Sequence, residues 1–381
     1  MVHRLTPLAQ FTFSGERIVI VLIVLSLLAI IAFVVTSLIL RKYVRLIVNV
    51  LDDQTLEPEI GTNGHARPNG EVVKFTAADG HPLKGTILKA RGGPATGMVI
   101  FAHEFGSERS SCVRYCQALI NGGYDVFAFD FRGHGESPAE PGYRPRWLPT
   151  DRETSDMRGA IDYITRRLES LGRPKDLTLF GVSRGGNAAI MAAVGLPHVK
   201  TLITDGVFSS DVTLEYLMRR FATIFGGIRV LTENYPPTFW RFMRWLLLRE
   251  CARRYRCRFP STQSALRRLG RKPLLMIHGQ RDSYVPITQA QQLYDIAHGP
   301  KKLWIVPDAR HNESVLVNPN TYGQRVVSFL NEHAIPGQSP QPAMVPTPRR
   351  GFSERLKRTP ANLSTPVIAT EMETIANSAA T

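Results

Sequence analysis

The segment Gly181–Gly185, with the sequence Gly-Val-Ser-Arg-Gly, constrains the fold of this chain more than any other. It follows the apolar run 177–180 and leads into the small-residue run 186–190, which is the order strand, sharp turn, helix. Glycines on both sides of the serine let a strand and a helix pass close together. The pattern predicts that Ser183 stands at the apex of the turn, with its hydroxyl exposed above a sheet.

A serine hydroxyl is a poor nucleophile at neutral pH, so it needs a histidine to take its proton and a carboxylate to orient that histidine. Both follow in the chain. Asp282 lies in a loop directly after the apolar strand 273–277, and His311 lies just after the strand-like segment 302–306. We therefore predict that Ser183 is the nucleophile, His311 the general base and Asp282 the orienting acid.

The same residues also admit structural interpretations. The serine could belong to an ordinary turn. Asp205, at the end of another apolar run, is a rival for the acid. Asp282 could instead cap the helix that follows it, because aspartate favours helix N-termini, and His311 could be a surface-loop histidine. We expect His103 and His134 to be structural residues of their loops rather than bases.

Two further segments strengthen the case for a known family. Residues 130–137, Asp-Phe-Arg-Gly-His-Gly-Glu-Ser, match a D-x-R-G-x-G-x-S loop, and the apolar strand 98–102 runs into His-Glu-Phe-Gly at 103–106. With the serine turn and the chain order Ser, Asp, His, these segments make the chain similar to the α/β-hydrolase superfamily. They resemble its branch of monoglyceride lipases, lysophospholipases and serine aminopeptidases. The resemblance covers roughly residues 70–335.

The resemblance implies an oxyanion hole formed by the backbone N–H groups of Phe105 and Arg184, which would stabilise charge that appears only in the transition state. Glu104 departs from the family pattern, because the usual motif at 103–106 is H-G-x-G and glycine suits a tight turn. No metal ion and no organic cofactor is implied.

Strands and helices alternate along residues 70–335, which predicts an α/β fold with a mostly parallel eight-stranded sheet flanked by helices. Asp79-Gly80 is a hairpin turn signal between the first two strands. We expect strands near 71–77, 82–90, 97–103, 124–130, 177–182, 200–205, 273–278 and 302–307, and helices near 109–122, 152–172, 184–195, 286–298 and 321–334.

Residues 18–40 contain no charged side chain and are almost entirely apolar. At ~1.5 Å per residue this helix would reach about 34 Å, enough to cross a hydrocarbon core of ~30 Å. A cleaved signal peptide has a shorter apolar core and a small-residue cleavage site, and a buried core helix is rarely so uniformly apolar. We predict one uncleaved transmembrane helix at 18–40, with a flank at 1–17 and a linker at 41–69.

The basic residues beside this span are nearly balanced, with a slight excess after it, which favours a catalytic domain on the cytoplasmic side. The four cysteines also favour a domain on the cytoplasmic side. Neither Cys112 with Cys116 nor Cys251 with Cys257 has a spacing that demands a disulfide. A glycan on the sequon at Asn312 would obstruct His311, which argues against a eukaryotic lumenal domain.

Residues 209–270 form an insertion that is too long for a simple connection and resembles a helical cap over the active site. Aromatic residues and arginines interleave over 239–258. Such a helix could bury its apolar face on the core and leave its arginines solvated, or it could dock on anionic lipid headgroups. The net charge of +15 suits either interpretation, and no nucleic-acid-binding motif accompanies it.

The tail 336–381 is rich in proline, serine, threonine and alanine and is expected to be disordered. The chain as a whole is interpreted as a membrane-anchored serine hydrolase that cleaves carboxylic esters or thioesters, lipid-like ones included, through an acyl-enzyme. A peptidase or acyltransferase would use the same triad. A non-catalytic membrane scaffold is the alternative of another class. Nothing in the sequence indicates an oligomeric state.

Overall fold

The computed structural model describes residues 15–52, 68–226 and 236–333. The chain divides into two compact units, Met1–Asp52 and Asp53–Thr381, and each is described here by itself. The predicted tail at 336–381 lies outside the described residues, as do most of the predicted flank at 1–17 and the later part of the predicted linker.

The first unit contains the helix α1 (Gly15–Asp52). Ile18–Asn49 is long and apolar enough to cross a membrane, a property that a signal sequence would share. The large apolar side chains from Ile18 to Ile39 are exposed, as they would be against lipid. The helix extends beyond the predicted span of 18–40, because a second apolar run, 46–51, continues after the basic residues that follow the span.

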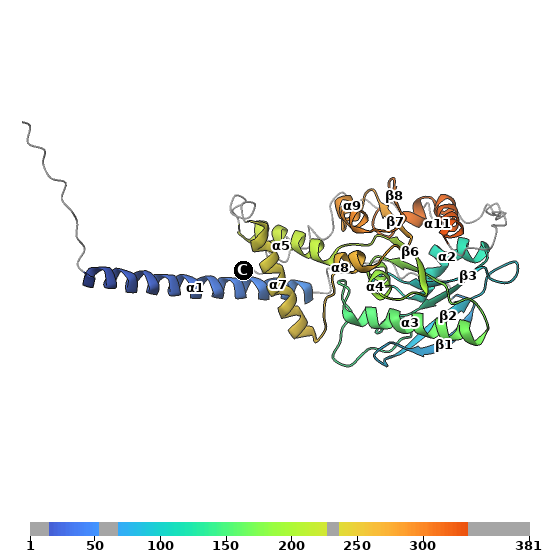
Figure 1. Ribbon diagram of the computed structural model, residues 1–381, viewed down its shortest axis with the longest axis horizontal. Coiled ribbons are helices and arrows are strands. Elements are labelled where there is room, and N and C mark those ends of the chain that lie inside the picture. The colour runs from blue at the N-terminus through green and yellow to red at the C-terminus, as the bar shows by residue number, and fades with distance from the viewer. Residues whose placement is uncertain (1–14, 53–67, 227–235, 334–381) are drawn as a thin grey trace, which may run out of the picture. The chain divides into compact units, whose positions relative to one another are not determined.

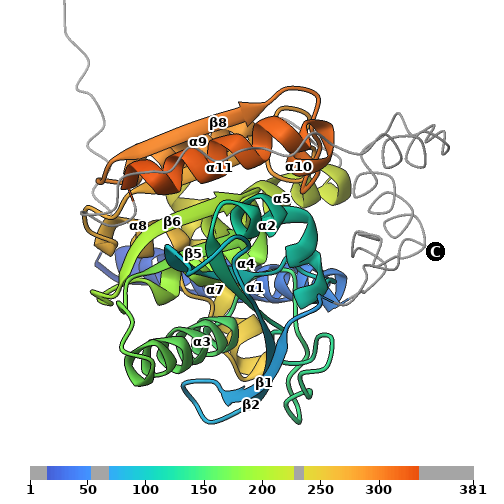
Figure 2. The same cartoon turned by 90° about the vertical axis from the view of Figure 1, so that its right-hand side faces the viewer.

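The second unit is built on one eight-stranded sheet (Figures 1 and 2). The spatial order is β1-β2-β4-β3-β5-β6-β7-β8, and only β2 runs antiparallel to its neighbours. The mostly parallel fold predicted from the sequence is therefore confirmed. The strands are β1 (Glu71–Thr76), β2 (Pro82–Leu88), β3 (Gly97–Ala102), β4 (Tyr124–Phe129), β5 (Leu177–Val182), β6 (Val199–Asp205), β7 (Leu274–Gly279) and β8 (Lys301–Val306).

Helices cover both faces of the sheet, which is why the central strands β4, β5 and β7 are buried along their whole length. One apolar core contains side chains of α3 (Asp151–Ser170), α4 (Arg184–Ala192) and α9 (Ile287–Ile296). A second core contains side chains of α2 (Cys112–Asn121) and α11 (Pro319–His333). These five helices are the ones that the sequence predicts. A short turn of 3₁₀ helix, η2 (Arg109–Ser111), precedes α2, and α10 (Ser314–Val317) precedes α11.

The long segment between β6 and β7 is mostly helical where it is described. It contains α5 (Ser210–Gly226), α7 (Pro237–Tyr255) and α8 (Thr262–Arg268). The helices α5 and α7 contact each other, and α8 contacts α4, the helix that follows Ser183. We call α5 and α7 the cap helices.

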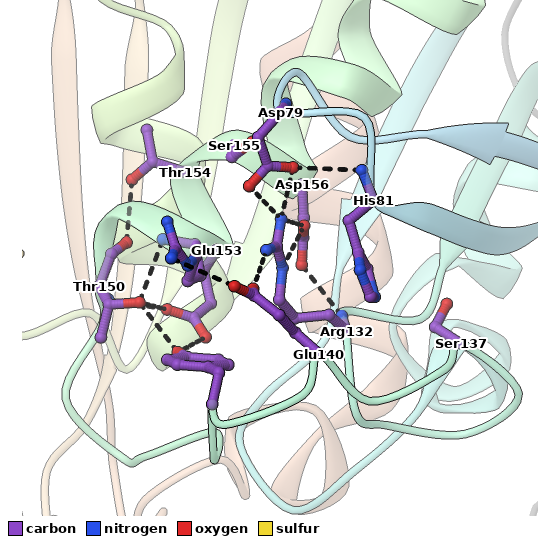
Figure 3. Close-up of polar contacts among 12 residues, drawn as sticks. Asp79, His81, Arg132, Ser137, Glu140, Thr150, Glu153, Thr154, Ser155 and Asp156 are labelled. Carbon is purple, nitrogen blue, oxygen red and sulfur yellow. Dashed lines mark hydrogen bonds and ion pairs between the residues drawn. The ribbon is translucent and has the colours of Figure 1, made fainter. Parts of the chain in front are cut away.

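The loop after β4 is fixed by a buried arginine (Figure 3). The Arg132 guanidinium forms ion pairs with the fully buried Asp156 of α3, with Glu140 and with Asp79 of the β1–β2 turn. A buried charge needs this degree of pairing to offset its loss of hydration. Arg132 thus joins the loop, the hairpin and α3 into one structure.

The register of the sheet places the carboxyl ends of β5, β6 and β7 side by side. Val182 pairs with Asp205, and Asp205 pairs with Ile277. Because these strands are parallel, the residues that follow them emerge at the same place. Ser183, Asp205 and the loop that contains Asp282 are therefore neighbours, although they are far apart in the sequence.

Candidate active site

Ser183 stands in the sharp turn that the sequence predicts, and its backbone there is strained. Its φ of 50° is in a region that residues with a side chain rarely adopt. The turn depends on its glycines. A Cβ at Gly181 would lie 2.5 Å from the backbone of Gly186, and one at Gly185 would lie 2.3 Å from the carbonyl oxygen of Ala102 in β3. The helix α4 can therefore begin directly after the strand β5 only because both positions lack a side chain.

The structure brings the three predicted site residues together. Oγ of Ser183 lies 2.9 Å from Nε2 of His311, and Nδ1 of His311 lies 2.6 Å from Oδ2 of Asp282. Both are hydrogen-bond distances. With Nδ1–H donated to the carboxylate, Nε2 is the acceptor that faces the serine hydroxyl. This arrangement can move a proton from Ser183 to His311.

Asp282 is fixed by its own loop. Its Oδ1 accepts hydrogen bonds from the backbone N–H groups of Tyr284 and Val285, at 2.9 and 2.8 Å. Burial alone would raise the pKa of Asp282, but His311, and to a lesser extent His278 and the N–H of Val285, hold the pKa below its usual value. The carboxylate therefore stays ionised. His278 contacts the same loop, because its Nε2–H donates a hydrogen bond to the carbonyl oxygen of Val285 at 2.8 Å.

Asp205, the rival acid, is occupied elsewhere. Its carboxylate accepts hydrogen bonds from the hydroxyl groups of Ser314 and Tyr322, at 3.0 and 2.9 Å. Burial raises its pKa to about 7. Since Ser314 begins α10 and follows His311 closely, Asp205 helps to hold the loop that carries the histidine. Among the described residues, it is Asp282 and not Asp205 that hydrogen-bonds to His311.

The imidazole of His311 is surrounded by carboxylates. Its burial would lower the pKa, but Asp282, and to a lesser extent Asp205 and Glu104, raise the pKa above its ordinary value. The His311 imidazolium that a proton transfer creates is therefore stabilised where it forms.

The predicted oxyanion-hole residues have suitable N–H groups. Within the described ranges, neither the N–H of Phe105 nor that of Arg184 has a hydrogen-bond acceptor in the protein. The N–H of Arg184 lies in the first turn of α4, where no intrahelical acceptor exists and where anions are favoured. Both N–H groups therefore keep free hydrogen-bonding capacity in the described part of the chain.

Glu104 is accommodated for a simple reason. The left-handed backbone of its turn falls on Gly106, with a φ of 70°, and not on Glu104. The carboxylate is buried and accepts hydrogen bonds from Oγ of Ser111, at 3.2 Å, and from Nη2 of Arg114, at 3.1 Å. A side chain at position 104 is therefore compatible with the turn because its charge has partners of its own.

The side chain of Arg184 has a structural role that the sequence alone does not reveal. It is fully buried and donates to the carbonyl oxygen of Arg146, at 2.8 Å, and to Nε2 of His134, at 3.1 Å. Its guanidinium also lies 4.6 Å from the ring centroid of Phe105. One side chain thus holds the loops around Ser183. The signal for this role in the sequence is an arginine inside a turn of otherwise small residues.

His103 and His134 hold loops, as expected. Nδ1 of His103 donates to the carbonyl oxygen of Glu104, and Nε2 accepts from the N–H of Phe131, so the ring carries no free base. Burial lowers the pKa of His103 to about 4. In the described part of the chain, no group of three or more His, Cys, Asp or Glu residues is arranged to hold a metal ion. The thiols of Cys112, Cys116, Cys251 and Cys257 are buried and form no disulfide.

Residues 93–227 match a family described as "Serine aminopeptidase, S33". Protein YfhR of Escherichia coli O157:H7 is 28% identical over 269 residues, which cover 69% of this chain and 81% of that protein. Protein YqkD of Bacillus subtilis is 24% identical over 322 residues, covering 81% and 97%. The esterase Pf2001 of Pyrococcus furiosus has a similar structure, with a TM-score of 0.51, 22% identity and coverage of 70% and 91%. At that identity the likeness concerns the fold alone.

Proposed function

We propose that this chain, an α/β hydrolase by its sheet and by the family match of residues 93–227, is a membrane-anchored serine hydrolase of carboxylic esters or thioesters. The observation that carries the proposal is the continuous hydrogen-bonded path from Oγ of Ser183 through His311 to Asp282. The strained backbone of Ser183 supports the same reaction, as do the N–H groups of Phe105 and Arg184, which have no acceptor among the described residues.

The reaction would proceed in two halves. Oγ of Ser183 attacks the acyl carbonyl carbon while Nε2 of His311 takes the hydroxyl proton, and the N–H groups of Phe105 and Arg184 stabilise the resulting oxyanion. The carbonyl re-forms, and the bond to the leaving group breaks as His311 donates the proton to that group. Water then attacks the acyl-enzyme with His311 as base, which releases the acid and restores the serine.

The substrate would be a small-molecule or lipid-like acyl ester. The apolar span at residues 18–40 would serve as a single-pass anchor that keeps the hydrolase domain at a bilayer, with the domain on the cytoplasmic side. Protease protection in sealed vesicles of known orientation tests this topology. Protection of the hydrolase domain in vesicles whose lumen corresponds to the non-cytoplasmic side would contradict it.

The first experiment is labelling of the detergent-solubilised full chain with a fluorophosphonate probe. Wild type should be labelled, whereas Ser183→Ala should not be, and His311→Ala should be labelled far more slowly because the hydroxyl has lost its base. A folded wild type that resists the probe would overturn the enzyme proposal and favour a scaffold.

A peptidase is the second candidate, because the family that matches residues 93–227 is described as a serine aminopeptidase. Matched pairs of ester and amide substrates with the same acyl group separate the two. We expect hydrolysis of the ester and thioester members. Faster turnover of the amide members by the same serine would reassign the chain to peptide substrates.

A further inference from the structure

Exposed aromatic side chains are concentrated on the cap helices. Of the aromatic side chains described in residues 68–333, those exposed to solvent are Tyr216 of α5 and Phe242 and Trp245 of α7. Phe242 is 48% exposed and Trp245 is 52% exposed. Their rings stack with centroids 6.0 Å apart. Grouped, exposed aromatic rings of this kind mark an interaction surface.

These rings lie on the outer face of α7. The buried residues of the helix are Trp240, Met243, Leu247 and Cys251, which follow the spacing of a single helical face. At about 100° per residue, Phe242, Trp245 and Arg249 fall on the opposite face. One face of α7 therefore makes the apolar contacts with the protein core. Packing against the core does not explain why Phe242 and Trp245 lie on the opposite face.

The surroundings of the two rings are strongly basic. Residues 241–258 contain seven arginines and one glutamate. Arg241, Arg249 and Arg253 are exposed on α7, and the guanidinium of Arg249 lies 5.3 Å from the ring centroid of Trp245. The glutamate, Glu250, pairs with Arg253. The excess positive charge fits an anionic partner.

We propose that the outer face of α7, defined by Arg241, Phe242, Trp245 and Arg249, docks on the headgroup layer of an anionic phospholipid bilayer. Tryptophan and phenylalanine rings can enter the boundary between headgroups and acyl chains, while neighbouring arginine side chains extend their guanidinium groups to lipid phosphates. The surface goes beyond the proposed hydrolase activity, because it assigns a lipid partner to a helix that contains none of the triad residues.

A bilayer fits this face better than a protein partner does. The apolar part consists of two stacked rings rather than a groove, and the exposed charged residues of α7 around it are arginines. The apolar helix Ile18–Asn49 of the same chain is a candidate span. If it crosses a membrane, the chain between residues 52 and 70 keeps the start of the sheet domain within about 60 Å of the end of that helix, at ~3.5 Å per extended residue.

Contacts lead from α7 to the nucleophile. The ring of Tyr255, the last residue of α7, lies 3.9 Å from the guanidinium of Arg146. The carbonyl oxygen of Arg146 accepts the hydrogen bond of Arg184, the residue after Ser183. A helix held at the membrane would therefore be connected through two arginines to the turn that carries the serine.

The test uses the full chain, one copy per nanodisc, so that a second copy cannot supply the contact. Discs contain brominated phosphatidylcholine alone or with added phosphatidylglycerol, and bromine near the headgroups quenches tryptophan emission. We expect stronger quenching in the anionic discs, and we expect the excess to disappear in Trp245→Phe. The double variant Arg241→Glu, Arg249→Glu should also lose the excess.

A matched control carries the same change of charge on α3, as Arg158→Glu with Arg166→Glu, and should keep the excess quenching. The milder pair Arg241→Gln, Arg249→Gln is measured as well, in case the reversed charges disturb folding. Equal quenching in both kinds of disc, or an excess that persists in Trp245→Phe, would overturn the proposal. An excess that the control loses equally would show attraction by net charge alone. The readout needs no catalysis, so it is independent of whether Ser183 reacts.

Discussion

Nη2 of Arg184 donates a hydrogen bond to Nε2 of His134 at 3.1 Å, so this histidine must remain neutral. Burial lowers the pKa of His134 well below its usual value, and the charge of Arg184 lowers it further. Nδ1 of His134 donates to the carbonyl oxygen of Arg132, which fixes the tautomer. A cation and a neutral imidazole together support the loops on either side of the nucleophile.

Replacing this arginine should impair catalysis while leaving the triad in place. In Arg184→Met the backbone N–H is retained, but the bonds to His134 and Arg146 are lost. We expect kcat/KM for a short-chain ester to fall between about tenfold and 100-fold, the usual cost of small displacements around reacting groups. Arg184→Lys should recover only part of the loss, since an ammonium group cannot reproduce the planar geometry. Wild-type activity in Arg184→Met would contradict this positioning role.

The part played by Arg184 shows where prediction from the sequence ends. The succession of strands and helices along the chain, the serine turn and the choice of Asp282 and His311 as candidates follow from local patterns, since an apolar strand followed by a polar loop is readable in the chain itself. The arginine contacts depend on three loops that meet only in the folded protein. The accommodation of Glu104 likewise depends on Arg114, ten residues away on α2, and the sequence gives no spacing rule for such a pair.

Asp282 and Asp205 should differ sharply when each is changed to asparagine. In Asp282→Asn the amide would favour the wrong tautomer of His311, and we expect kcat to fall by about 10⁴-fold. In Asp205→Asn the contact between Asp282 and His311 remains, so activity should stay within about tenfold of wild type. Rates of fluorophosphonate labelling measure both. The reverse ranking would make Asp205 the acid.

Glu104 should influence the pH dependence of the reaction. The reaction needs neutral His311, so kcat/KM rises as the pH passes upward through the pKa of that residue, which the carboxylates hold above its ordinary value. In Glu104→Gln one negative charge is removed and the imidazolium is less stabilised. The ascending limb should therefore move to lower pH, by less than about one unit because Asp282 dominates. Exposed Glu169→Gln is the control, and a shift to higher pH would contradict the argument.

Arg132 should matter for stability and not for chemistry (Figure 3). In Arg132→Ala the fully buried Asp156 loses its main partner, and burial already raises the pKa of that carboxyl to about 6. Leaving one half of a buried ion pair costs about 3–5 kcal/mol, so the free energy of unfolding in urea, measured in mild detergent, should fall by that amount. The exposed pair of Arg166 with Asp162 gives the comparison. Arg166→Ala should change the free energy of unfolding by less than about 1 kcal/mol. Equal losses in the two variants would mean that burial does not increase the contribution of the Arg132 ion pairs to stability.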